Sequence, residues 1–367
     1  MLDSTPTSTF PLNTATPGNL SLDRISLGLV GLNFGRWIVL NHLLAESGSR
    51  YFHLAALCDA NLAKLDNLKT ELGPRFTGKT YTSLDEMLDN PEIRVVGLFT
   101  GPVKRAELIR KIIRKGKDVI TTKPFELDAE AALAVLKEAR ELGRVVVLNS
   151  PAPVLRPDFA KIFEWQKTHC LGQAVAARME ATASYSEKAD GSWYDNPELC
   201  PVAPIFRIGI YLINDLCNFF HDPESVFVQH SRIRTGRPTP DNAQMGIRYR
   251  NGALANVFAS FCVEDGDWYR NSLILNFEHG TVYRDVGPVR TNPSRLTLIK
   301  CGAGEKRTIV DEVELTQASD SYPWNHFHDM IKGHTPPNVT SPEQIVEGIR
   351  IVNAMSRAEL ANGMATV

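Results

Sequence analysis

The sequence lacks any marked excess of one charge. Among its 367 residues, 40 Lys and Arg face 42 Asp and Glu, for a formal net charge of -2. Such a balance provides no electrostatic attraction to nucleic acid or to an anionic membrane. The sequence also contains no motif that reads DNA or RNA. We therefore expect neither nucleic acid nor a membrane as a partner.

Long apolar runs and clustered cysteines are also missing. No stretch reaches the roughly 18 continuous apolar residues of a membrane span. The six cysteines show no CxxC spacing and no nearby histidine cluster, so we expect no metal site but reduced, mostly buried thiols in a cytoplasmic protein. Residues 1–22 are rich in Ser, Thr and Pro without an apolar core, which predicts a flexible tail rather than a signal peptide.

From residue 23 onward, short apolar runs alternate with amphipathic stretches. Strands are expected at 25–30, 53–58, 94–100, 118–122 and 144–149, with helices between them. This alternation favours βαβ units in a doubly wound parallel sheet, the Rossmann arrangement, over residues 23–150.

The rhythm changes after residue 150. Strand-like runs follow one another across short turns, at 174–183, 226–234, 244–249, 254–261, 272–277, 281–285 and 295–299. Helices are expected at 156–168, 206–220, 322–332 and 342–362. The pattern predicts an α+β domain with a large, mostly antiparallel open sheet over residues 151–367. We expect its last helix to pack back on the first domain.

The turn after the first strand carries an incomplete dinucleotide fingerprint. Gly31 takes the first glycine position, Asn33 the second, and Gly35 falls one place before the third. Asn33 tolerates the positive φ of a tight turn, and Gly35 lets the start of the following helix approach a pyrophosphate. Phe34 and Arg36 lie in the same turn, so we expect them to contact the cofactor as well.

An acidic residue, Asp59, ends the second predicted strand. A carboxylate there binds both ribose hydroxyls and repels a 2′-phosphate, which favours NAD as the cofactor. Arg36 and Lys64 are nearby cations that would reverse this preference, so NADP stays open. The alternative role of Asp59 is to cap the next helix.

Three further candidates follow the later strands. Thr100 and Pro102 come after the third predicted strand, and Asn149 ends the fifth. Ligands of open parallel sheets bind outside the carboxyl ends of the strands. We therefore expect all three residues beside the cofactor.

The fourth strand ends in a recognisable string, Gly116-Lys-Asp-Val-Ile-Thr-Thr122-Lys123-Pro124. It resembles the GKHVxxEKP signature of the glucose–fructose oxidoreductase / inositol dehydrogenase / rhizopine catabolism (Gfo/Idh/MocA) family, and the similarity extends over almost the whole chain from residue 24. The resemblance implies an oxidoreductase with these two domains. It also implies that Lys123 is the active-site lysine, that Lys123 and Pro124 border the cofactor, and that the peptide bond between them is cis. Thr122 stands where the family has Glu.

The helix that opens the second domain departs from the family's DxGxHxxD motif. Its aligned positions hold Arg207, Gly209, Tyr211 and Asn214. A lysine cation close to Tyr211 would stabilise the phenolate, so Tyr211 can exchange the proton of a carbinol during hydride transfer. Arg207 lies one helical turn before Tyr211, and we expect it to clamp a substrate carboxylate or phosphate.

Two further residues complete the expected substrate site. Asn214 lies on the same helix face as Arg207 and Tyr211, and Trp193 lies in the polar loop that precedes this helix. We expect both side chains to border a carbohydrate-like substrate, although a packing role for Trp193 is equally compatible with the sequence.

Three functions compete at this stage. The first is an NAD(P)-dependent dehydrogenase or reductase acting on a CH–OH group of a sugar, polyol or sugar acid. The second, favoured by Thr122, Arg207 and Asn214, is an NAD(P)-binding sensor or regulator without turnover. The third is a redox-neutral glycosidase or epimerase, in which bound NAD oxidises the substrate and later reduces it. In each case the open sheet face favours a homodimer or homotetramer.

Overall fold

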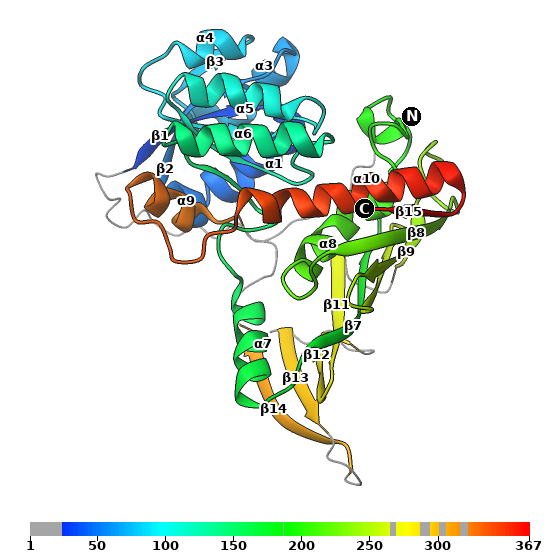
Figure 1. Cartoon of the computed structure of the whole chain (residues 1–367). Helices are drawn as coiled ribbons and strands as arrows, with labels where there is room; N and C mark the ends of the chain where they lie inside the picture. The colour runs from blue at the N-terminus through cyan, green and yellow to red at the C-terminus, as the bar shows by residue number, and fades with distance from the viewer. Residues whose placement is uncertain (1–23, 186, 265–268, 287–293, 301–305, 316–321) are drawn as a thin grey trace.

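The chain forms two units joined by a long helix, as the computed structural model in Figure 1 shows. The structure describes residues 24–185, 187–264, 269–286, 294–300, 306–315 and 322–367. The predicted tail, residues 1–22, lies outside the described residues.

The first unit is a six-stranded sheet in the order β3-β2-β1-β4-β5-β6, with every neighbouring pair parallel. This is the Rossmann strand order, whose direction of progression reverses between β1 and β4. Five strands match the predicted ones. The sixth, β3, is a three-residue edge strand without an apolar run. The strands span Ile25–Val30 (β1), Phe52–Cys58 (β2), Lys79–Tyr81 (β3), Val95–Leu98 (β4), Asp118–Thr121 (β5) and Val146–Leu148 (β6).

Helices cover both faces of this sheet, and side-chain caps begin three of them. The Asn61, Ser83 and Asp128 side chains accept hydrogen bonds from the first backbone amides of α3, α4 and α6. The helical segments are α1 (Leu32–Ile38), the π-helix η1 (Val39–Leu43), α2 (Glu46–Ser49), α3 (Leu62–Leu72), the 3₁₀ turn η2 (Gly73–Arg75), α4 (Leu84–Leu88), α5 (Arg105–Arg114) and α6 (Ala129–Glu141).

The second unit is built on a nine-stranded sheet in the order β14-β13-β12-β11-β7-β10-β9-β8-β15. Only β7 and β10 pair in parallel; the other neighbours are antiparallel. The sequence patterns missed β14 and β15. The strands span Ala174–Ala183 (β7), Pro223–Ser231 (β8), Asn242–Tyr249 (β9), Leu254–Ser260 (β10), Tyr269–Phe277 (β11), Gly280–Arg284 (β12), Ser294–Lys300 (β13), Thr308–Leu315 (β14) and Met364–Thr366 (β15).

The helix expected at 206–220 is in fact two consecutive segments, a π-helix followed by a shorter α-helix. A hydrophobic period near 3.6 does not distinguish i→i+4 from i→i+5 hydrogen bonding. The helical segments of this unit are α7 (Pro157–Thr168), the 3₁₀ turn η3 (Trp193–Asp195), the π-helix η4 (Ile205–Gly209), α8 (Ile210–Leu216), α9 (Trp324–Ile331) and α10 (Pro342–Ala361).

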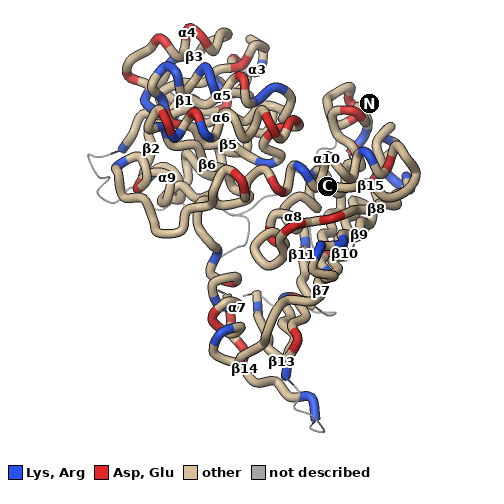
Figure 2. The backbone as a smooth tube through the Cα atoms, viewed as in Figure 1, with Lys and Arg blue, Asp and Glu red and all other residues tan. Residues whose placement is uncertain are grey.

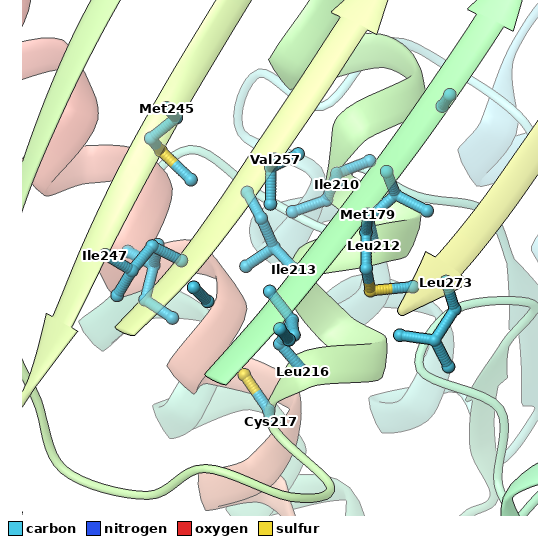
Figure 3. Packing of buried hydrophobic residues seen from close by; sticks show 14 of the residues in the cluster. Met179, Ile210, Leu212, Ile213, Leu216, Cys217, Met245, Ile247, Val257 and Leu273 are labelled. Carbon is cyan, nitrogen blue, oxygen red and sulfur yellow. The ribbon is translucent and has the colours of Figure 1, made fainter. Parts of the chain in front are cut away.

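Helix α8 is fixed to the sheet by its apolar side chains. Leu212, Ile213 and Leu216 are each at most 1% exposed, and they pack against residues of β7, β9 and β10 such as Met245 and Val257 (Figure 3). Each such side chain contributes about 1.5–3 kcal/mol on burial. This packing determines the orientation of the whole helix and thereby of its polar residues.

Helix α10 belongs to the cores of both units. Its first turns place Ile345, Val346 and Ile349 in the core of the Rossmann unit, while Val352 and Met355 lie in the core of the second. The helix packs against α6 and crosses α8 on its way to β8 and β15 (Figure 1). The two units are therefore held in a defined relative position, with the carboxyl ends of the parallel strands close to α8.

Charges of both signs and free cysteines are spread over both units of the described chain. Lys and Arg are interspersed with Asp and Glu along both units (Figure 2). No helix among the residues that the structure describes combines the length and apolar character of a membrane span. The five described cysteines are free thiols, and Cys58, Cys200 and Cys217 are buried.

Candidate active site

The turn after β1 is shaped by two glycines, with different roles. Gly31 has φ of 87°, and a Cβ there would lie 2.9 Å from the Phe99 carbonyl oxygen, so the two turns approach closely. A Cβ on Gly35 would lie 2.7 Å from Leu29 Cδ2. Gly35 therefore permits close packing of α1 on β1, while its expected role toward a pyrophosphate stays a prediction.

Asn33 corrects one expectation, because it does not occupy a positive-φ position. It lies inside α1, and its side-chain oxygen accepts a hydrogen bond of 2.6 Å from Lys64 Nζ. The left-handed conformation that the turn requires is supplied by Gly31 alone. Arg36, which we expected to contact the cofactor, donates hydrogen bonds of 2.8 and 2.5 Å to the Glu71 carboxylate.

Asp59 connects two turns at the carboxyl edge of the sheet. Its carboxylate accepts hydrogen bonds from the Leu32 amide at 2.7 Å and from the Asn61 amide at 2.9 Å. The capping residue of α3 is Asn61, so Asp59 is not the helix cap. The nearby cations Arg36 and Lys64 are bonded to protein side chains rather than presented together toward the carboxylate.

These residues fit a bound dinucleotide. The first turn of α1 carries no acidic residue and no side-chain cap, which leaves the positive end of the helix dipole toward the turn. Phe34 is 41% exposed on this helix, and its ring stacks on that of Trp37 at 5.4 Å between centroids. The Asp59 carboxylate lies where such sheets bind a ribose.

Arg105 organises the loops after β4 and β5, and the sequence analysis missed it. Its guanidinium is 1% exposed and donates hydrogen bonds to the carbonyls of Thr122, Pro124 and Thr100. Burial lowers its pKa to about 10. An arginine at the start of an amphipathic helix is ordinarily solvated, so no local sequence signal distinguishes this one.

The loop after β4 has little freedom to move. Thr100 is held through its carbonyl, and its hydroxyl donates a hydrogen bond of 3.3 Å to the Gly101 carbonyl. Pro102 is buried inside the same turn. Both residues lie at the expected edge of the sheet, and they shape the turn mainly through the backbone.

Lys123 and Tyr211 come together across the two units. Lys123 Nζ lies 4.5 Å from the centroid of the Tyr211 ring. Asn149 links the pair, because its Nδ2 donates to the Tyr211 hydroxyl at 3.0 Å and its Oδ1 accepts from the Lys123 amide at 3.1 Å. The Lys123–Pro124 peptide bond is cis, as the family resemblance implies.

Thr122, the residue before Lys123, is held by a hydrogen bond from the segment that precedes α9. Thr122 is buried and its hydroxyl accepts a hydrogen bond of 2.8 Å from the Tyr322 hydroxyl. Burial raises the pKa of Tyr322. Tyr322 also lies edge-on to the Phe99 ring at 5.7 Å, so the segment before α9 supports the loops after both β4 and β5.

Arg207 does not present its guanidinium for an anion clamp. Both terminal nitrogens donate to the Glu187 carboxylate at 2.7 Å, and the side chain is largely buried. Burial lowers the pKa of Arg207, but the hydrogen bonds to Glu187 outweigh it, so the pKa is raised. The expected substrate clamp is corrected: an internal carboxylate, which the sequence spacing could not place, satisfies this cation.

Asn214 and Trp193 each contact a residue of the other unit or of the junction. Asn214 is 6% exposed and donates to Ser150 Oγ at 3.0 Å. It fits against α10 because Gly348 has no side chain there. Asn214 also lines a cavity of about 400 Å³ at the junction, so its expected contact with substrate stays a prediction. Trp193 approaches Gly101, where a Cβ would lie 3.4 Å from the indole ring.

A cavity of about 860 Å³ adjoins this site through Asn149. Its walls come from both units and include Tyr269, Asn271, Arg284 and Trp324. No cluster of three or more His, Cys, Asp or Glu side chains suited to a metal ion occurs among the described residues.

Two family models cover most of the chain. Residues 25–150 match the oxidoreductase family with an NAD-binding Rossmann fold, and residues 159–283 match the GFO/IDH/MocA C-terminal domain. The chain therefore belongs to the Gfo/Idh/MocA oxidoreductase family. It is a dehydrogenase or reductase whose first unit is an NAD-binding Rossmann domain.

Individual relatives are distant in sequence. The 1,5-anhydro-D-fructose reductase of Ensifer adhaerens is 24% identical over 295 residues, covering 77% of this chain and 84% of that protein. Levoglucosan dehydrogenase, solved with NADH and levoglucosan, superposes with a TM-score of 0.72 at 15% identity, covering 94% of this chain and 99% of that one.

A third similar protein, of known structure, is described as NADPH-dependent. A candidate NADPH-dependent oxidoreductase from Desulfitobacterium hafniense superposes with a TM-score of 0.74 at 14% identity, over 94% of this chain and 98% of that one. At such identities the structural similarity shows the shared fold.

Proposed function

We propose that the chain transfers a hydride between NAD and the carbinol or carbonyl carbon of a sugar, polyol or sugar acid, and that Lys123 and Tyr211 handle the proton. The observation that carries this proposal is the set of contacts among Lys123, Tyr211 and Asn149 at the domain junction. The Lys123 ammonium lies 4.5 Å from the Tyr211 ring, and Asn149 holds the Tyr211 hydroxyl at 3.0 Å.

The proton chemistry follows from these contacts. Oxidation of a carbinol releases the hydroxyl proton, which a positioned base must accept. A neighbouring cation and a hydrogen bond from Asn149 Nδ2 both favour the phenolate form of Tyr211. In the opposite direction the Tyr211 hydroxyl donates its proton to the oxygen of the carbonyl being reduced. A nicotinamide, when bound, would supply or accept the hydride.

The proposed cofactor contacts are those at the carboxyl edge of the Rossmann sheet. Gly31 gives the backbone room to approach the pyrophosphate, and Asp59 receives the ribose hydroxyls. Arg36 and Lys64 are engaged by Glu71 and Asn33, which supports NAD over NADP. Thr100 and Pro102, in the turn after β4, would border the bound cofactor.

The test is a turnover assay with the full chain. Wild-type protein is mixed with NAD or NADP and a panel that includes levoglucosan, myo-inositol and hexose acids, or with NADH and 1,5-anhydro-D-fructose. Reduced cofactor is followed by absorbance. We expect turnover with NAD or NADH, and its loss in Lys123→Met. If the protein binds NADH but turns over no member of the panel, the result would instead support an NAD(P)-binding sensor or a redox-neutral glycosidase or epimerase.

We further propose a cytoplasmic homo-oligomer. The buried free thiols of Cys200 and Cys217 suit a reducing compartment. Large apolar side chains lie exposed on the nine-stranded sheet, with exposed fractions of 44% for Phe227, 57% for Leu254 and 74% for Met364. A sister subunit that covers this face would bury them.

A further inference from the structure

We infer that Arg207 is a positioning residue that acts from both of its ends. Its main-chain carbonyl holds the Lys123 ammonium, and its guanidinium, through Glu187, anchors the loop formed by residues 187–195 against the active site. The inference rests on the proposed function, because it assigns how the proposed catalytic lysine is oriented.

The guanidinium end is held in an aromatic cage. The rings of Tyr194, Phe261 and Tyr185 lie 3.9, 4.7 and 5.2 Å from the Arg207 guanidinium carbon. The two bonds to Glu187 define the direction of the planar group, since a bidentate pair has little angular freedom. Stacking and pairing together fix Glu187 relative to the helix that carries Tyr211.

A second buried arginine, Arg237, contacts both Glu187 and Asp195 of the 187–195 loop. Arg237 is 6% exposed, lies 3.4 Å from the Glu187 carboxylate and donates to Asp195 at 2.6 Å. Asp195 in turn accepts hydrogen bonds from the amides of Asp190 and Gly191 at 2.7 and 2.6 Å. The 187–195 loop is thus a compact unit, tied to the second domain through Glu187 and Asp195.

The far end of the loop reaches the Rossmann unit. Trp193 packs over Gly101, in the turn after β4 that Arg105 also supports. The side chains of Lys123 and Trp193 therefore approach the junction from neighbouring loops, and Arg207 is connected to both. A shift of Arg207 would displace the lysine and the loop together.

The carbonyl end is the more unusual contact. Lys123 Nζ donates a hydrogen bond to the Arg207 carbonyl oxygen. Arg207 lies in the π-helix η4, and such widened turns are frequent at functional sites. In the family motif that the sequence resembles, an aspartate takes this position; here the main-chain oxygen of Arg207 faces the lysine.

The test measures the accessibility of Lys123 directly and needs no substrate. The NADH-bound full chain is labelled competitively with acetic anhydride, and acetylation of each lysine is quantified by mass spectrometry. In Glu187→Gln the buried guanidinium loses its counter-charge, so we expect η4 to shift and Lys123 to react about tenfold faster, the factor expected for a lost charge-assisted hydrogen bond. Lys137, which is 53% exposed and paired with Glu343, is the internal control and should not change.

A second variant, Arg207→Lys, keeps the charge but loses the bidentate fork, and should give an intermediate rate. Affinity for NADH should stay within threefold of wild type in both variants, which verifies folding. In the turnover assay we expect kcat to fall while KM for the substrate changes less. Unchanged Lys123 labelling in both NADH-binding variants would overturn the inference. The proposed function fails separately, if Lys123→Met turns over like wild type.

Discussion

At the scale of single residues, the sequence was informative about which residues meet and less so about what each one does. Lys123, Tyr211 and Asn149 could be nominated because strand ends and a family motif place them at one edge of a sheet. Gly35, Asn33, Arg207 and Asn214 were given roles that depend on side-chain partners. For Asn33, Arg207 and Asn214 those partners are Lys64, Glu187 and Ser150, which lie 31, 20 and 64 residues away in sequence, so no local pattern reveals them.

The residues that were missed share one property. Arg105, Glu187 and Tyr322 carry polar groups that bond to the backbone or to a buried side chain of the protein. In a sequence they resemble solvated residues or ordinary packing aromatics, because burial is decided by the tertiary fold.

His42 gives a residue-scale prediction for pH dependence. Burial lowers its pKa from 6.5 to about 4, and its ring packs against those of Trp37 and Tyr322. Between pH 6.5 and 4 the unfolded chain therefore binds a proton that the folded chain does not. The free energy of unfolding should fall as the pH drops through this window. Urea unfolding at several pH values measures the slope.

The control for that experiment is His42→Gln. In this variant the unfolded chain should bind about one proton fewer, relative to the folded chain, than in wild type over this pH window. The free energy of unfolding should therefore depend less on pH, because the group that titrates differently in the two states is gone. A slope identical to that of wild type would show that His42 titrates alike in the folded and unfolded chain.

At the scale of helices and strands, periodicity found the long, buried elements and missed those without apolar runs. Strand β3 has three residues with no buried side chain, and β14 is largely exposed. Strand β15 has only three residues, which follow immediately on α10. The π-helix η4 was also unforeseen, since it differs from an α-helix in hydrogen bonding rather than in hydrophobic pattern. These elements are defined by their neighbours in space.

A buried ionic cluster joins α7, α8 and β12, and it gives an element-scale prediction. Asp158 lies between Arg156, at 2.9 Å, and Arg284, and Arg156 also contacts Asp215 at 3.1 Å. Asp158→Asn would remove the carboxylate that lies between Arg156 and the buried Arg284, which should lower the free energy of unfolding by about 3–5 kcal/mol. Equilibrium urea unfolding provides the measurement.

The matched control removes an exposed carboxylate from a pair. Asp89 and Lys115 are 66% and 53% exposed, so Asp89→Asn should cost less than about 1 kcal/mol. Equal losses in the two variants would mean that the cluster at Asp158 is no stronger than a surface pair.

At the scale of the whole molecule, the alternation of strands and helices predicts both architectures and their order along the chain. The strand orders, with the reversal between β1 and β4 and the parallel pairing of β7 with β10, come only from the structure. Contacts of this kind join segments distant in sequence, and the local pattern carries no record of the pairing.

The open face of the nine-stranded sheet gives a prediction about assembly. Leu254→Glu places a charge on this face, at a side chain that is 57% exposed, and should reduce the oligomer to a smaller species by light scattering. Leu360→Glu, on α10 at 87% exposure, should leave the mass unchanged. NADH affinity should be preserved in both. A Leu254→Glu protein with the wild-type mass would place the subunit contact elsewhere.

The most direct test of the central claim is the rate of a single turnover in Tyr211→Phe, measured with bound NAD or NADH and the best substrate of the panel. Removing the hydroxyl leaves the ring against Lys123 but takes away the group that exchanges the proton. We predict a rate lower by about 10²–10⁴-fold, the usual contribution of general acid–base catalysis, with NADH affinity unchanged. A Tyr211→Phe enzyme as fast as wild type would contradict the assignment of Lys123 and Tyr211 as the groups that handle the proton.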